Sequence, residues 1–128
     1  MTTAMPTAAM AADKPHSRNG PETWDTSGHV SGWFEHKGDK LVAWDAVADG
    51  KSAVLAARRQ HWSDHNIRYY CTPLWNAKGS GHLVKRTCDG KDPAYTPEGW
   101  YMFYFPCTGE YAGREMGDCG AMEGMGVT

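Results

Sequence analysis

Four cysteines in a chain of 128 residues constrain the fold more than any other feature of the sequence. They are Cys71, Cys88, Cys107 and Cys119. An even number of cysteines is typical of a small protein that folds in an oxidising compartment and is held by disulfide bonds. The rival use is a zinc site, which the spacing disfavours. No Cys-x-x-Cys pair occurs, and His82 is the only histidine between the cysteines.

The segment between the first two cysteines predicts how the four pair. It reads "TPLWNAKGSGHLVKRT", which is typical of a strand, a turn and a second strand. A hairpin that turns at 79–80 places Cys71 directly opposite Cys88, where the two Cβ atoms are close enough to bridge. The second bridge is then Cys107–Cys119. Each closed loop is expected to stabilise the fold by about 2–3 kcal/mol.

Short apolar runs alternate with turn residues along the rest of the chain. Strands are predicted at 31–36, 40–45, 51–59, 67–72, 82–88 and 100–107. The Ala-rich run 51–59 is also compatible with a helix, but the turn signals at both of its ends, including Asp49-Gly50, favour a strand. The pattern predicts an all-β fold: a small disulfide-stapled β-sandwich or jelly-roll-like domain.

Aromatic side chains have to supply part of the core, because Leu and Ile are scarce and the chain has six Trp and six Tyr. Trp33, Trp44 and Trp100 stand in predicted strands and are expected in the core. Trp24 and Trp62 stand in polar segments and are candidates for a partner-binding surface. A loop Trp that folds back onto the sandwich explains the last two equally well.

The chain divides into four segments by composition. Residues 1–11 are interpreted as the remnant of a signal peptide, because they carry no charge and Ala9-Met10-Ala11 has the spacing that a signal peptidase reads; an ordinary N-terminus with chance spacing is the other interpretation. Residues 12–30 are predicted to be a flexible arm, 31–119 the sandwich, and 120–128 a flexible Gly/Met-rich tail. Together with the cysteines, this organisation predicts a secreted, extracellular protein.

Charge and motif content argue against several classes of function. The formal net charge is −2 and the pI is about 6.3, which disfavours nucleic acid or an anionic membrane surface as a partner. No apolar run of about 18 residues is present that would span a membrane. The sequence also lacks Gly-x-Ser-x-Gly, His-Glu-x-x-His and a phosphate-binding loop. We therefore expect a protein that is not an enzyme and that needs no cofactor and no metal.

Two groups of polar residues are compatible with chemistry but have a simpler explanation. Four carboxylates surround one predicted hairpin: Glu35, Asp39, Asp45 and Asp49. Two of them would suffice as the acid and the nucleophile of a glycosidase, and calcium is a further use, although their spacing matches no calcium loop. His61 and His65 would share a metal if they stood on a helix. Solvated turn carboxylates and loop histidines explain both groups without a site.

The polar segment ahead of the first predicted strand is the strongest candidate for a binding element. A sandwich of this size does not need such a segment, and an extended peptide can become ordered in the groove of a partner. Lys14 and Arg18 would suit a cleft that accepts basic side chains, and Trp24 would add apolar area. The alternative is slack chain without a role.

One stretch of the chain resembles a known family. The pattern Gly-Trp-Phe, Gly-Asp, Trp-Asp and Asp-Gly-x-Ser-Ala-Val is followed by Cys-Thr-Gly-Glu-Tyr at 107–111 and by a closing cysteine. Its residues are Gly32, Trp33, Phe34, Gly38, Asp39, Trp44, Asp45, Asp49, Gly50, Ser52, Ala53, Val54 and Cys119. Over 31–119 the chain resembles small secreted proteins of Streptomyces and related actinobacteria.

Within that group the chain is similar to the small adaptor subunit of the umbrella toxin particles, which are antibacterial assemblies. The resemblance implies a non-enzymatic adaptor. Its β domain would bind the ring of a large repeat-containing toxin subunit, and its N-terminal extension would insert in the cleft of a trypsin-like, lectin-bearing subunit. The expected partner-binding residues are then Lys14, Arg18, Trp24 and Trp62, and the arm takes its role by position alone. The alternative function is a cell-wall or carbohydrate-binding module.

Overall fold

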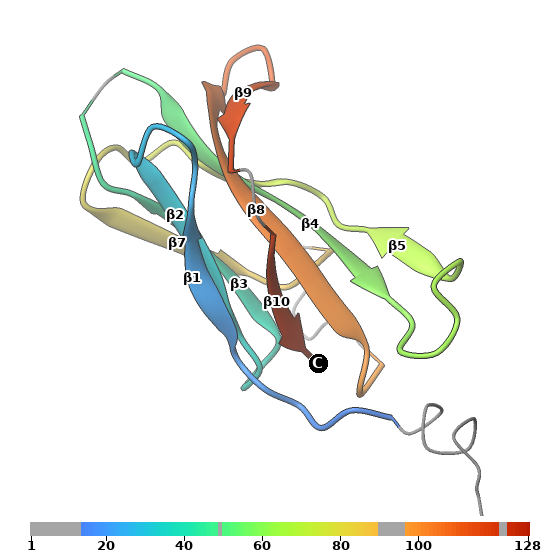
Figure 1. Ribbon diagram of the computed structural model, residues 1–128. Coiled ribbons are helices and arrows are strands. Elements are labelled where there is room, and N and C mark those ends of the chain that lie inside the picture. The colour runs from blue at the N-terminus through green and yellow to red at the C-terminus, as the bar shows by residue number, and fades with distance from the viewer. Residues whose placement is uncertain (1–13, 49, 90–96, 121–122) are drawn as a thin grey trace, which may run out of the picture.

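The computed structural model describes residues 14–48, 50–89, 97–120 and 123–128 (Figure 1). These residues form ten strands and no helix, and so contain no helix that could cross a membrane. The strands are β1 Gly20–Trp24, β2 Val30–Glu35, β3 Lys40–Asp45, β4 Ser52–Gln60, β5 Arg68–Tyr70, β6 Leu74–Asn76, β7 His82–Arg86, β8 Tyr101–Glu110, β9 Glu115–Cys119 and β10 Gly124–Val127. The predicted all-β fold with two disulfide bonds is confirmed.

The strands form two antiparallel sheets that pack face to face (Figure 1). The first has four strands in the order β1-β2-β3-β7. The second is built on β4 and β8, which pair along nine residues from Ser52↔Gly109 to Gln60↔Tyr101. Short strands complete both of its edges: β5 and β6 pair with β4, whereas β9 and β10 pair with β8.

Side chains point alternately to the two faces of each strand, and those on the facing sides of the two sheets build the core. Phe34, Leu41 and Ala43 point inward from the four-stranded sheet and meet Leu55 and Met102 from the other. Ala57, Leu74, Tyr104 and the cysteines Cys71 and Cys88 complete this buried cluster. The Ala-rich run is a strand because it lies in the middle of a sheet, where its small side chains let a facing layer approach closely.

Both disulfide bonds form as predicted, but the reason given for the first was wrong. Cys107 and Cys119 lie opposite each other on β8 and β9, with a Cα–Cα distance of 4.0 Å. Cys71 and Cys88 lie 4.8 Å apart at Cα, yet the strands between them do not form a hairpin. β6 pairs with β4 and β7 pairs with β3, so the chain changes sheets between them and this bridge joins the two layers.

The segment expected to be a flexible arm over 12–30 contains a strand of the fold. β1 pairs with β2, and ahead of it the amide and carbonyl of Arg18 exchange 3.0 Å hydrogen bonds with Val127. The phenol of Tyr104 donates to the Pro21 carbonyl, and burial raises the pKa of this phenol well above its usual value. Close approach explains why a strand forms here: a Cβ at Gly20 would collide with the Tyr104 ring.

The tail expected to be loose over 120–128 also contains a strand. β10 pairs with β8 from Gly124↔Tyr104 to Val127↔Tyr101. Val127 and Thr128 are buried, and the Thr128 amide donates to the Trp100 carbonyl at 2.9 Å. The Gly-rich composition predicts a flexible tail. Its glycines instead let the backbone lie against the rings of Phe34 and Tyr104, where a Cβ at 124 or 126 would have no room. Residues 1–11, interpreted as a signal-peptide remnant, lie outside the described residues.

Candidate binding grooves

The outer face of the four-stranded sheet carries aromatic side chains that were expected in the core. Trp33 and Trp44 alternate with the inward Phe34 and Ala43, and each is only partly buried. Neither belongs to the core cluster. Pairing aligns Trp24, Ser31, Trp44 and Leu83 in one row across β1, β2, β3 and β7. The expectation for Trp33 and Trp44 was wrong because period two places them on the face opposite Phe34.

A β-bulge brings a carboxylate beside Trp33. Gly20 pairs with Phe34 and Thr23 pairs with Gly32, so two residues of β1 stand opposite the single residue Trp33. The two are Pro21 and Glu22. A bulge tolerates proline, which has no amide to donate, and it re-aims the neighbouring side chains. The Ser31 hydroxyl donates to Glu22 Oε2 at 2.9 Å and holds this carboxylate on the outer face.

Trp33 is held in place by a chain of polar contacts. Its indole Nε1 donates to Glu35 Oε2 at 3.2 Å, and Lys85 Nζ lies 3.1 Å from Glu35 Oε1. The hydrogen bond from Trp33 and the neighbouring Lys85 ammonium lower the pKa of Glu35 below its usual value. The indole is therefore oriented by a carboxylate that stays ionised, which preorganises its ring for contact with a ligand.

These side chains line a groove of about 400 Å³. Its lining residues are Asn19, Gly20, Glu22, Trp33, Phe34 and Glu35. Two of them are carboxylates and none is a cation, and we name this site the acidic groove. An aromatic ring with fixed polar groups around it is the usual composition of a site that binds a small group from a partner.

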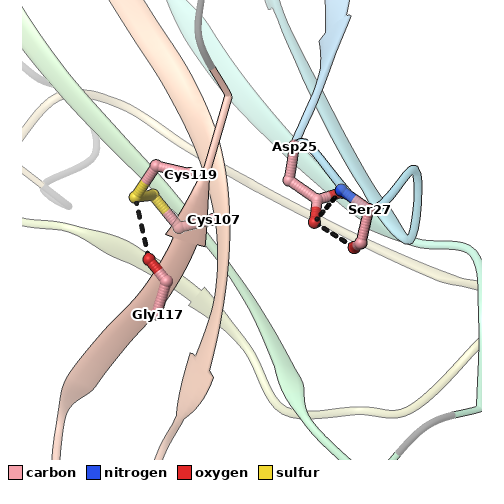
Figure 2. The surroundings of a disulfide bond; sticks show 5 residues. All are labelled: Asp25, Ser27, Cys107, Gly117 and Cys119. Atoms are coloured by element: carbon pink, nitrogen blue, oxygen red, sulfur yellow. Dashed lines mark hydrogen bonds between the residues drawn. A yellow bond between two sulfur atoms is a disulfide. The ribbon is translucent and has the colours of Figure 1, made fainter.

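The turn that joins β1 to β2 is organised by Asp25, which sequence reasoning missed (Figure 2). This side chain is only 4 % exposed and accepts the amides of His29 at 2.8 Å and Val30 at 2.9 Å. The amide and hydroxyl of Ser27 donate to its other oxygen. Burial alone would raise the pKa of Asp25, but these hydrogen bonds together outweigh burial and lower it. The buried carboxylate thus fixes the turn that aligns β1 with β2, the two strands that carry the acidic groove.

A second groove, of about 480 Å³, follows the opposite edge of the same sheet. Its lining residues are Trp75, Ala77, Lys78, Leu83, Val84, Lys85, Arg86 and Tyr111. Three are cations and none is a carboxylate, and we name this site the basic groove. The rings of Trp75 and Tyr111 meet edge to face at 5.9 Å, and Tyr111 and Leu83 are about two-fifths exposed.

The basic groove is supported from inside the sandwich. Asn76 is fully buried, and its Nδ2 donates to the Ala43 carbonyl at 3.1 Å and to the His82 carbonyl at 2.7 Å. This amide ties β6 to both β3 and β7 across the two layers. The bridge Cys71–Cys88 makes a second tie beyond the other end of β7.

The four residues predicted to bind partners do not form one site. The stem of Lys14 lies against Gly99, and Arg18 is bound through its backbone to Val127. Trp24 is 42 % exposed and belongs to the outer row of the four-stranded sheet. Trp62 stacks on His61 at 5.1 Å, in the loop between β4 and β5 at the far end of the sandwich from the β1–β2 turn (Figure 1). Only Trp24 therefore lies on the face that carries the acidic groove.

The carboxylates considered for a glycosidase are spread over both ends of one hairpin. Glu35 pairs with Lys40, whereas Asp45 lies five residues further along β3, which separates them by roughly 16 Å. Asp45 is buried on the inner face and Glu35 is on the outer face. Burial and then the charge of Glu98 raise the pKa of Asp39. Asp49 lies outside the described residues. This spread is too wide for Glu35 and Asp45 to share one substrate bond.

The histidines considered for metal binding have other contacts in the structure. His61 Nδ1 accepts the amides of Ser63 and Asp64, both at 3.1 Å, and its ring meets Trp100 edge to face at 5.2 Å. His65 is exposed in the same loop. Across the part of the chain that the structure describes, no three His, Cys, Asp or Glu side chains gather as a metal site would need.

Two signals in the sequence would have pointed to the grooves. The alternation Trp33-Phe34 predicts that one ring faces outward, because period two cannot bury both. Lys85-Arg86 places two cations on neighbouring positions of one strand, although only the sheet order shows that this strand is an edge. The bulge at Pro21-Glu22 left no comparable trace, since β1 lies in a polar segment that reads as an arm.

Comparison with known proteins identifies no relative. No family model matches the sequence, and no curated protein and no solved structure matches it. What the protein binds is therefore inferred from the two grooves.

Proposed function

We propose that this protein is a non-enzymatic, secreted adaptor that holds two different partners on one rigid sandwich. The observation that carries the proposal is the pair of aromatic grooves with opposite charge on two edges of the same sheet. An adaptor needs two separate surfaces that do not compete for one partner, and opposite charge discourages either partner from occupying the wrong groove. Two disulfide bonds staple the sandwich that carries both grooves and agree with an extracellular location.

The resemblance to the adaptor of umbrella toxin particles suggests what the partners are. A large repeat-containing toxin subunit would bind the sandwich at the basic groove, and a trypsin-like, lectin-bearing subunit would receive the N-terminal segment beside the acidic groove, which Asn19 and Gly20 line. From Arg18 onward the backbone is paired within the sandwich. Insertion would therefore involve residues up to Ser17, including Lys14, and Trp24 would act with the outer sheet face instead.

The test is a pull-down from culture supernatant with three forms of the protein, each tagged at the exposed residue His65 in the β4–β5 loop, which lines neither groove. The forms are the unaltered chain, an acidic-groove variant with Trp33→Ala and Glu22→Gln, and a basic-groove variant with Lys78→Glu and Arg86→Glu. We expect two co-purifying proteins with the unaltered chain and the loss of a different one with each variant. Recovery of the bait alone, or loss of both proteins with either folded variant, would overturn the proposal.

A carbohydrate-binding module is the second candidate, and the fixed indole of Trp33 favours it. A sugar ring can lie on an indole face while its hydroxyls bond to neighbouring amide and carboxylate groups, and Asn19 and Glu22 line the same groove. This function predicts saturable binding of the purified protein to cell-wall glycan that soluble sugar reverses and that Trp33→Ala removes. An unchanged binding curve for Trp33→Ala would exclude the groove as a sugar site.

A further inference from the structure

The free edge of β7 determines what the basic groove can hold. β7 is the last strand of its sheet, and within the described chain no strand pairs with its outer edge. The groove follows four consecutive residues of this strand, Leu83 to Arg86. A groove that runs along an unpaired strand edge suits an extended peptide, because the backbone supplies hydrogen bonds and the groove supplies side-chain contacts.

The direction of the backbone groups on that edge follows from the contacts of Asn76. Its Nδ2 donates to the carbonyls of both Ala43 and His82, so both carbonyls point into the gap between β3 and β7. Backbone groups alternate along an antiparallel strand, and those of Val84 therefore also face β3. The amides and carbonyls of Leu83 and Lys85 face away from β3, toward the groove, where an added strand would meet them.

Charge decides which peptide fits. The lining contains Lys78, Lys85 and Arg86 and no carboxylate. Lys85 is already engaged by Glu35, but Arg86 and Lys78 form no ion pair with any residue that the structure describes. Trp75, Tyr111 and Leu83 add apolar area beside these cations. A basic segment would be repelled here, whereas acidic side chains would gain charge-assisted contacts on both sides of the added strand.

We propose that the basic groove binds an extended acidic segment of a partner protein, which adds to the four-stranded sheet as a fifth strand beside β7. The inference deepens the proposed function, because it names the chemistry of one of the two partners. It can be tested without either partner, so its failure would leave the adaptor pull-down unaffected, and a failed pull-down would leave this groove open to test.

The probe is a synthetic peptide of alternating valine and glutamate, eight residues long, titrated into the full chain and followed by NMR. We expect saturable binding that weakens with added salt, together with slower hydrogen exchange of the Leu83 and Lys85 amides. The variant Lys78→Glu with Arg86→Glu should weaken binding at least tenfold. The matched variant Lys78→Arg with Arg86→Lys should bind within threefold of the unaltered chain, because it keeps both charges at the surface.

Four results would overturn the proposal. The first is no binding of the acidic peptide to the folded chain. The second is equal binding of a valine–lysine peptide of the same length. The third is binding without protection of the Leu83 and Lys85 amides, which would mean contact with side chains alone and no added strand. The fourth is self-association of the free chain that the Lys78→Glu and Arg86→Glu variant abolishes, which would make a second copy the occupant.

Discussion

The acidic groove and the basic groove lie on one sheet but are built by different means. The acidic groove depends on local contacts of β1, β2 and the turn between them: a bulge at Pro21–Glu22, the buried carboxylate of Asp25 and the contact from Trp33 to Glu35. The basic groove depends on ties between the two layers, Asn76 and the bridge Cys71–Cys88. One groove is thus supported by hydrogen bonds between residues close in the sequence, and the other by links between the two sheets.

This difference has a consequence for how each groove responds to change. Loss of β1 removes one wall of the acidic groove and also uncovers the core beneath it. Loss of a cross-link between the layers leaves both sheets present but frees the edge strand that forms the basic groove. Substitutions that act on one support at a time therefore separate the two grooves.

Deletion of residues 1–24 should have the largest effect. It removes β1, leaves the buried phenol of Tyr104 without its acceptor on Pro21, and exposes Phe34 and Tyr104 to water. Exposing two aromatic side chains and orphaning one hydroxyl costs roughly 5 kcal/mol or more, which is comparable to the whole stability of a small domain. Urea unfolding followed by tryptophan fluorescence should show little or no folded protein.

Deletion of residues 1–16 is the matched control for this experiment. It stops before Ser17, whose hydroxyl donates to the Thr128 carbonyl at 2.8 Å, and before the Arg18 backbone pair. We expect its urea midpoint to lie close to that of the unaltered chain. A stable fold after deletion of 1–24 would show that β1 is an accessory of the acidic groove and no part of the core.

Replacement of Cys71 and Cys88 by alanine should have the next largest effect. The chain-entropy model gives about 3 kcal/mol for a bridge of this sequence separation, 17 residues. Both cysteines are also buried in the core, which adds a packing loss. In NMR spectra the indole signal of Trp75 should shift and broaden, because Asn76 alone then ties β6 to β7, while that of Trp33 should stay in place.

Replacing Cys107 and Cys119 by alanine separates the entropic effect of losing a bridge from the effect of where that bridge lies in the fold. Its sequence separation is 12 residues, so the entropic loss is similar. This bridge joins neighbouring strands of one sheet and not the two layers. A smaller total loss of stability is therefore expected. Equal losses for the two pairs would contradict the layer-joining role of Cys71–Cys88.

The two disulfide bonds show how far the sequence alone predicts this fold. The pairing was predicted correctly, and the strands at 40–45 and 51–59 agree closely with β3 and β4. The hairpin between Cys71 and Cys88 was wrong because Gly79 permits a reversal within one sheet and a crossing to the other sheet equally well. The chain crosses to the other sheet because β7 pairs with the edge of β3. Nothing in the sequence of residues 41–45 indicates that β3 will accept a strand there.

The candidate site was less predictable than the fold. Local composition marked Trp24 but assigned Trp33 to the core, because a tryptophan in a strand can face either way until its sheet has a known interior. The segments expected to be flexible at both ends contain strands, since glycines at 20, 124 and 126 allow the backbone to lie against aromatic rings. Polar, Gly-rich composition describes disorder and close backbone packing alike.

Asp25→Asn tests the polar support of the acidic groove and should have a moderate effect. An amide cannot accept all the bonds that the carboxylate takes from Ser27, His29 and Val30, so the variant should lose about 1–3 kcal/mol at neutral pH. Because folding lowers the pKa of Asp25, the carboxylate stabilises the fold fully above the usual value of 3.8. That stabilisation is lost as the pH falls through the lower folded value.

The measurement is the free energy of unfolding from urea curves between neutral pH and about pH 2. The difference between the unaltered chain and Asp25→Asn should shrink as the pH falls below 3.8. Ser27→Ala removes only one hydroxyl donor and serves as the milder control, at about 1 kcal/mol. If the difference in unfolding free energy between the two proteins stays constant with pH, the charge of Asp25 does not contribute to stability and only the shape of its side chain does.

Lys85→Met should change stability least and yet affect both grooves in opposite directions. Lys85 and Glu35 are 46 % and 35 % exposed at their side chains, so solvent screening limits their ion pair to less than about 1 kcal/mol. Without the ammonium, Glu35 keeps the bond from Trp33 but adds an uncompensated charge to the acidic groove, while the basic groove loses one of its three cations. An acidic peptide should then bind more weakly at the basic groove, and a trilysine probe should bind more strongly at the acidic groove. Lys85→Arg retains the charge and should leave both titrations unchanged, so a loss of both affinities in Lys85→Met would mean that the two grooves share one structural support after all.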